Sequence, residues 1–96
     1  MRLDVFLKSS RLVLRRSAAQ ELCDAGLVYV NGHTAKSSKE VKEGDELRIE
    51  RRNRKTVVKI MKLPPGKQVS KHDAPSLYEM IEDEVTEDDF LIRESA

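Results

Sequence analysis

The sequence has few of the residues that build disulfides, metal sites and base-stacking surfaces. Among its 96 residues are one cysteine, two histidines, no tryptophan, two tyrosines and two phenylalanines. Cys23 cannot form an internal disulfide, and with two scattered histidines it has no metal-ligand spacing, so we expect neither a metal nor a cofactor. The scarcity of aromatic residues also argues against recognition of single-stranded RNA by base stacking on a sheet.

Long hydrophobic runs are absent as well. No stretch of about 18 apolar residues could span a bilayer, so we expect no contact with a membrane. The first 16 residues contain no uninterrupted apolar core followed by a small-residue cleavage site, so we expect no signal peptide and a cytoplasmic location.

The common catalytic motifs are missing too. The sequence has no P-loop, no GxSxG and no HExxH, and Cys23, His33, His72 and the dispersed carboxylates form no recognised constellation. Cys23 lies on a small-residue face of a predicted helix, where cysteine commonly has a packing role. The sequence therefore predicts a binding protein and not an enzyme, with no small-molecule substrate.

Charge is distributed unevenly along the chain, although the formal net charge is only +1. Residues 1–72 hold 17 of the 18 Lys and Arg and 8 of the 17 Asp and Glu, which gives this segment a net charge of +9. Residues 73–96 hold the remaining residues of both kinds and have a net charge of −8. A basic body followed by an acidic tail indicates a polyanionic partner, although such charges also serve solubility alone.

The N-terminal third predicts two helices. Leu3, Phe6 and Leu7 have the spacing of one apolar helical stripe over residues 2–9, on which Asp4 and Lys8 are expected to pair at i, i+4. A buried connection is expected at 12–14. Ser17 and Gln20 form a capping-box pattern, which predicts that the second helix begins at Ser17, directly after Arg15 and Arg16.

The middle of the chain predicts short strands. Gly26 is suited to end the second helix, residues 27–30 are β-prone, Asn31-Gly32 is a typical hairpin turn, and residues 33–39 are expected to form an exposed loop. A turn at 41–46, a strand at 47–51, a basic hairpin tip at 51–55 and a strand at 56–61 follow. The sequence thus predicts an α+β fold with two or three short helices packed on a small antiparallel sheet.

The composition divides the chain into three parts: a domain at residues 1–63, a linker at 64–73 around a Pro-Pro-Gly sequence, and an acidic tail at 74–96. Leu77, Ile81 and Val85 repeat every four residues, so we expect the tail to contain an amphipathic helix and to be partly helical. The role of residues beyond Val85 is not predicted.

Several cations and neutral hydrogen-bonding groups are expected to lie on rigid elements or in the loop. Two guanidinium groups next to a helix N-terminus are suited to bind a phosphate, which favours recognition of the backbone and shape of folded RNA. The candidate RNA-binding residues are Arg2, Lys8, Arg11, Arg15, Arg16, Ser17, Gln20, Asn31, His33 and Lys36, with Thr34 and Lys39 beside them.

Five short motifs resemble the S4-type RNA-binding domain of ribosomal proteins in both order and spacing. They are Arg2–Leu7, Arg15–Ala18, Gly26–Gly32, Lys36 and Gly44-Asp45, and the resemblance covers about residues 1–61. It implies helices packed on a small antiparallel sheet. It also implies contact with structured RNA through Arg2, Lys8, Arg15, Arg16, Ser17, Gln20 and Lys36.

Over most of its length the chain is similar to the small ribosome quality-control members of this family. The similarity implies a cytoplasmic, ribosome-associated factor, expected to be a monomer, that binds large-subunit rRNA and peptidyl-tRNA on an obstructed subunit and assists an RqcH-type factor in alanine tailing. Other possibilities are a heat-shock-type subunit-recycling or ribosome-assembly factor, a protein-interaction adaptor acting through the acidic tail, and a small DNA-binding module.

Overall fold

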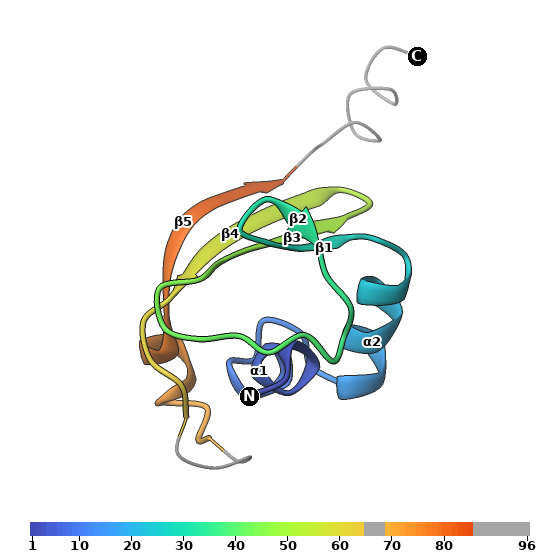
Figure 1. Cartoon of the computed structure of the whole chain (residues 1–96). Coiled ribbons are helices and arrows are strands. Elements are labelled where there is room, and N and C mark those ends of the chain that lie inside the picture. The colour runs from blue at the N-terminus through green and yellow to red at the C-terminus, as the bar shows by residue number, and fades with distance from the viewer. Residues whose placement is uncertain (65–68, 86–96) are drawn as a thin grey trace.

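The computed structural model describes residues 1–64 and 69–85 and shows two helices on one side of an antiparallel sheet (Figure 1). The helices are α1 (Leu3–Ser9) and α2 (Arg16–Asp24). The strands are β1 (Val28–Val30), β2 (His33–Thr34), β3 (Glu46–Arg51), β4 (Arg54–Ile60) and β5 (Tyr78–Val85), and a 3-10 helix, η1 (Ala74–Leu77), precedes the last strand. The predicted α+β class is confirmed.

The sheet has the strand order β2-β1-β3-β4-β5, with all neighbours antiparallel. The β3–β4 hairpin runs in register from Glu46↔Lys59 to Arg51↔Arg54, which places the predicted basic tip at residues 52 and 53. Its alternate residues Leu47 and Ile49 are fully buried, as period-2 alternation predicts for a half-buried strand.

The core lies between the helices and the sheet. Leu3, Phe6 and Leu7 of α1 have no exposed surface, so the predicted apolar stripe is the face that packs on the sheet. Because α1 has only seven residues, far fewer than the roughly 12–15 that an isolated helix needs, this burial must hold it in place. Cys23 belongs to the same core, which confirms its packing position.

The C-terminal helix prediction is wrong over residues 78–85. This segment is strand β5, paired with β4 from Arg54↔Val85 to Ile60↔Tyr78, and the only described helical turn of the tail is η1. In β5, backbone hydrogen bonds to β4 satisfy backbone donors and acceptors, and Asp83 and Glu82 form ion pairs with Arg54 and Lys55 of β4. The four-residue spacing of Leu77, Ile81 and Val85 contains no information on these contacts with a distant strand. The tail beyond residue 85 lies outside the described residues, and the division into domain, linker and tail stays a prediction.

Three N-terminal predictions also need correction. α2 begins one residue earlier than expected, with Arg15 at the N-cap and no side-chain cap, so Ser17 lies inside the first turn and the capping box does not form. Leu14 is 79% exposed and does not belong to a buried connection, whereas Val13 does. His33 and Thr34 form the short edge strand β2 and not a loop, because the Asn31-Gly32 turn directs them back along β1.

The turn between β1 and β2 depends on backbone conformations that L-residues rarely adopt. Asn31 and Gly32 have φ values of 51° and 87°, as a two-residue hairpin turn of the primed type requires. A β-carbon at Gly32 is strained in this region, so we expect Gly32→Ala to lower the free energy of unfolding by about 1–2 kcal/mol. Urea unfolding checks this, with Ser38→Ala as the control; equal stability of the two variants would contradict it.

Candidate nucleic-acid interface

A buried carboxylate joins the two helices. Asp4 has no exposed surface, and its Oδ1 accepts a hydrogen bond of 2.8 Å from the backbone N–H of Val5. Its Oδ2 accepts hydrogen bonds from Arg16 Nε at 3.1 Å and from Gln20 Nε2 at 2.9 Å, both on α2. Arg2 Nε lies 3.2 Å from Oδ1. The expected Asp4–Lys8 pair is therefore replaced by contacts with Arg2, Arg16 and Gln20.

The surroundings of Asp4 keep it ionised. Burial by itself raises the pKa of the carboxyl group, but the hydrogen bonds from Gln20 and Arg16 and the charges of Arg16 and Arg2 outweigh burial and lower the pKa below its ordinary value. Two arginines facing one carboxylate leave one surplus positive charge at this place. The cluster, named here the Asp4 cluster, comprises Arg2, Asp4, Arg16 and Gln20.

The Asp4 cluster fixes its arginines and leaves them accessible. The side chains of Arg2 and Arg16 are 43% and 45% exposed, although each has a nitrogen against the buried carboxylate. A guanidinium group held on one edge can still donate from its other nitrogens. A phosphate that binds here meets two cations whose conformational freedom is already restricted.

The segment carrying Lys36 and Lys39 lies against this cluster. The backbone N–H groups of Leu3 and Asp4 donate to the carbonyl oxygens of Lys39 at 2.8 Å and Ser37 at 3.1 Å. Arg2 also forms an isolated antiparallel bridge with Glu40. These bonds satisfy donors at the start of α1 and hold the backbone of Ser37 and Lys39 against it.

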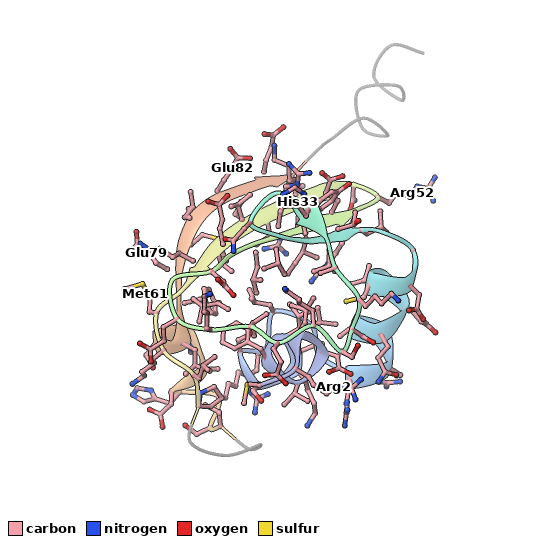
Figure 2. All side chains as sticks on the ribbon, in the orientation of Figure 1. Arg2, His33, Arg52, Met61, Glu79 and Glu82 are labelled. Atoms are coloured by element: carbon pink, nitrogen blue, oxygen red, sulfur yellow. The ribbon has the colours of Figure 1, made fainter. Side chains whose placement is uncertain are left out.

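The candidates near the β1–β2 turn form a second group. Asn31, His33 and Lys36 line an open hollow of about 420 Å³ together with Lys39. The side chain of Asn31 already donates to Asp45 Oδ1 at 3.2 Å and accepts from the N–H of Glu46 at 2.9 Å, so it holds the turn in place. In Figure 2, His33 lies at the sheet in the upper part of the view and Arg2 lies at the helices in the lower part, so the structure does not bring these two residues together.

The remaining candidates lie apart from the two groups or on their margin. Lys8 is exposed in the last turn of α1, and Arg15 is exposed at the N-cap of α2. Arg11 has a left-handed backbone (φ 61°) and lines a hollow with Arg51 and Arg54 of the β3–β4 hairpin. Ser17 is exposed in the first turn of α2, and RNA contact by each of these residues stays a prediction.

Sequence reasoning missed the role of Asp4 and misassigned Gln20. The i, i+4 spacing assigned Asp4 to Lys8 as a surface partner, and the capping-box pattern assigned Gln20 to the N-terminus of α2. The available signal was the position of Asp4 directly after Leu3 in the first turn of α1, which brings its side chain to the boundary of the core.

The Cys23 thiol is buried, and the described part of the chain contains no cluster of metal-ligating side chains. Burial, followed by the nearby charges of Asp4 and Asp24, raises the pKa of the Cys23 thiol to about 11, so the thiol is protonated at neutral pH. Residues 1–64 and 69–85 contain no group of three or more His, Cys, Asp or Glu that could hold a metal ion. None of the described helices has the length and apolar character needed to cross a bilayer.

Comparison with known proteins gives consistent results. The S4 domain model matches residues 1–47. The chain is 45% identical to the RQC P-site tRNA stabilizing factor of Halalkalibacterium halodurans over 88% of this chain and 93% of that protein. It is 39% identical to the Bacillus subtilis protein of the same name, over 88% and 95%.

A solved structure shows the same fold. The trimeric structure of Heat Shock Protein 15 from Vibrio cholerae superposes with a TM-score of 0.74 at 28% identity, covering 99% of this chain and 90% of that one. With the S4 motifs, the helix pair and the extent of these similarities established, the chain belongs to the family of S4-domain proteins named RQC P-site tRNA stabilizing factor, or RqcP.

Proposed function

We propose that this protein is a non-enzymatic RNA-binding factor of ribosome-associated quality control. In this proposal it binds the large ribosomal subunit obstructed by peptidyl-tRNA, contacts rRNA and tRNA, and assists an RqcH-type factor in adding alanine tails. It acts in the cytoplasm as a monomer.

The observation that carries the proposal is the Asp4 cluster. Arg2 and Arg16 are held by one buried carboxylate, and each keeps nearly half of its side chain exposed. Arginine is suited to bidentate contact with phosphate, and prior fixation reduces the conformational entropy lost on binding. In this proposal these contacts recognise the backbone of a folded RNA, and Lys36 and Lys39, whose segment packs its backbone on the start of α1, add further phosphate contacts.

The names of the relatives support the cellular setting. Proteins that are 39% and 45% identical over most of this chain are named for stabilizing P-site tRNA in RQC. A large subunit that holds a tRNA in its P-site presents phosphates of both the tRNA and the rRNA to a binding protein. The cooperation with an RqcH-type factor and the alanine tailing rest on the family resemblance.

Arg16→Ala is expected to weaken binding to large subunits carrying peptidyl-tRNA by about tenfold at physiological salt, because a charge-assisted phosphate contact is lost. The slope of log affinity against log salt should also decrease in magnitude by about 1. Affinity is measured across a salt series from about 50 to 200 mM.

Two variants control this experiment. Arg52→Ala removes the same charge from the hairpin tip, where Figure 2 shows Arg52 pointing away from the body, and should change affinity much less. Arg16→Lys keeps the charge but loses the planar donor fork, so its affinity should be intermediate. If Arg16→Ala and Arg52→Ala have equal effects, the assignment of the phosphate contact to the Asp4 cluster is wrong.

The structural likeness to Heat Shock Protein 15 favours one alternative, a heat-shock-type subunit-recycling or ribosome-assembly factor. The two functions differ in what the protein recognises. Equal binding to empty and peptidyl-tRNA-carrying large subunits would favour the alternative, whereas quality control requires preference for the obstructed subunit.

A further inference from the structure

The last strand of the sheet presents an open edge. β5 stands at the end of the strand order and pairs only with β4 among the described strands. Seven of its eight residues are exposed, and only Tyr78 is half-buried. The backbone groups along its outer side therefore have no described strand as a partner, and an exposed strand edge is a template for pairing with another chain.

Exposed apolar side chains gather at this edge. Of the five large hydrophobic residues that are exposed in the described parts of the chain, Met80, Ile81 and Val85 belong to β5. A fourth, Met61, is 48% exposed and its N–H donates to the carbonyl oxygen of Leu77, directly before β5, at 2.8 Å. Such a concentration of apolar surface on one strand is typical of an interaction site.

The same strand is strongly acidic. Four of its eight residues are acidic and none is basic. Asp83 Oδ2 lies 2.7 Å from Arg54 Nη2, and Glu82 Oε2 lies 2.9 Å from Lys55 Nζ. Glu79 and Glu84 form no ion pair with a described residue. Figure 2 shows Glu79 and Glu82 directed outward along the same side of the molecule as Met61.

These charges determine which partner fits the edge. Nucleic-acid phosphates are repelled by carboxylates. Antiparallel pairing of β5 with a second copy of β5 would bring eight carboxylates together, and four of them, Glu79 and Glu84 of each copy, form no ion pair with a described residue. Like charges on adjacent strands are unfavourable. An extended peptide that alternates basic and apolar residues can pair with the backbone, contact Glu79 and Glu84, and cover Met80 and Val85.

We propose that β5 is a docking strand for a basic, extended segment of a partner protein, which adds to the sheet next to β5. This interaction lies on a different part of the molecule from the Asp4 cluster. It goes beyond the proposed function, because one protein can then hold RNA through its helices and a protein partner through its sheet edge.

The test uses the full chain and a fluorescein-labelled eight-residue peptide that alternates lysine and valine. Fluorescence anisotropy measures affinity, and backbone amide chemical shifts locate the binding. We expect shifts at residues 78–85 and a loss of about tenfold in affinity in the double variant Glu79→Lys with Glu84→Lys, since two counter-charges are reversed. The control is Glu21→Lys with Glu43→Lys, which changes the net charge equally at exposed positions outside β5.

A second probe separates strand addition from simple charge attraction. The same peptide with N-methyl groups on alternate amides keeps its charge but cannot donate to a strand edge, so its affinity should fall at least tenfold when the methylated amides face β5. Both methylation registers are measured, and only one should lose binding. Unchanged affinity in both registers overturns strand addition, and equal affinity of the two double variants overturns the assignment to β5.

Two further measurements complete the test. Sedimentation that shows self-association of the unmodified chain, abolished by Glu79→Lys with Glu84→Lys, would assign the edge to a second copy and overturn the proposal. The same double variant should bind obstructed large subunits at least as tightly as the unmodified chain. A negative peptide experiment therefore leaves the RNA-binding proposal intact. Unchanged RNA binding by Arg16→Ala, which would contradict the RNA-binding proposal, leaves the peptide result intact.

Discussion

Asp4→Ala is expected to lower the free energy of unfolding by about 3 kcal/mol and to weaken binding to obstructed large subunits about tenfold. The stability loss follows because a fully buried carboxylate that receives hydrogen bonds from Val5, Arg16 and Gln20 is removed, and the donors of α2 lose their acceptor. The value is at the lower end for a broken buried ion pair because Arg2 and Arg16 remain about half-exposed to water.

The direction of the binding change is the informative part. Asp4→Ala makes the surface more positive by one charge, which on electrostatic grounds alone strengthens phosphate binding by less than about 1 kcal/mol. Loss of the Asp4 carboxylate releases Arg2 and Arg16 from their fixed positions. Each charge-assisted hydrogen bond from these arginines to phosphate is worth about 1.5–3 kcal/mol. The second effect is larger, so we expect weaker binding. Tighter binding by Asp4→Ala would show that Asp4 does not position the arginines.

Asp4→Asn provides the pH control and keeps the shape of the side chain. Because the pKa of Asp4 is lowered in the folded state from its ordinary value of 3.8, its ionised form contributes stability that is fully present above that value. This contribution is lost as the pH falls through the lower folded-state pKa. The difference in unfolding free energy between the unmodified chain and Asp4→Asn should be constant near neutral pH and shrink below about pH 4. A difference independent of pH down to pH 2 would exclude the ionised contact.

Phe6→Ala is expected to lower the free energy of unfolding by about 4 kcal/mol, which is the largest single effect on stability predicted here. The side chain is fully buried between α1 and the sheet, and it is the largest side chain with this burial. Small domains are typically stable by only about 5–15 kcal/mol, so this variant should be partly unfolded well below the melting temperature of the unmodified chain. Thermal and urea unfolding followed by circular dichroism measure the change.

Two substitutions serve as controls for Phe6→Ala. Phe6→Leu keeps most of the apolar volume and should cost about 1–1.5 kcal/mol. Leu14→Ala also removes a large apolar side chain, but Leu14 is 79% exposed, and the change should be within about 0.5 kcal/mol. If Phe6→Ala and Leu14→Ala destabilise equally, α1 is not held by packing on the sheet, and the placement of the Asp4 cluster needs another explanation.

The features that sequence reasoning predicted correctly are those determined within a few residues. The spacing of Leu3, Phe6 and Leu7 reveals the buried face of α1, because side chains three and four apart share one side of a helix. Asn31-Gly32 reveals the first hairpin because few other pairs adopt its backbone conformation. Alternation at Leu47 and Ile49 reveals β3.

The tertiary structure alone decided which charged side chain is buried and which distant residues pair with each other. Asp4 binds groups 12 and 16 residues away on α2, and Asp83 binds Arg54 across 29 residues. A local pattern extends over about four residues, so it assigned Asp4 to Lys8, Gln20 to a capping box and residues 78–85 to a helix. The sequence by itself determined a basic α+β body with an acidic C-terminal segment. Only the packing of α1 on α2 and the pairing of β5 with β4 converted those charges into a fixed arginine pair on one side and an acidic strand edge on another, because charge placement depends on contacts between residues far apart in the chain.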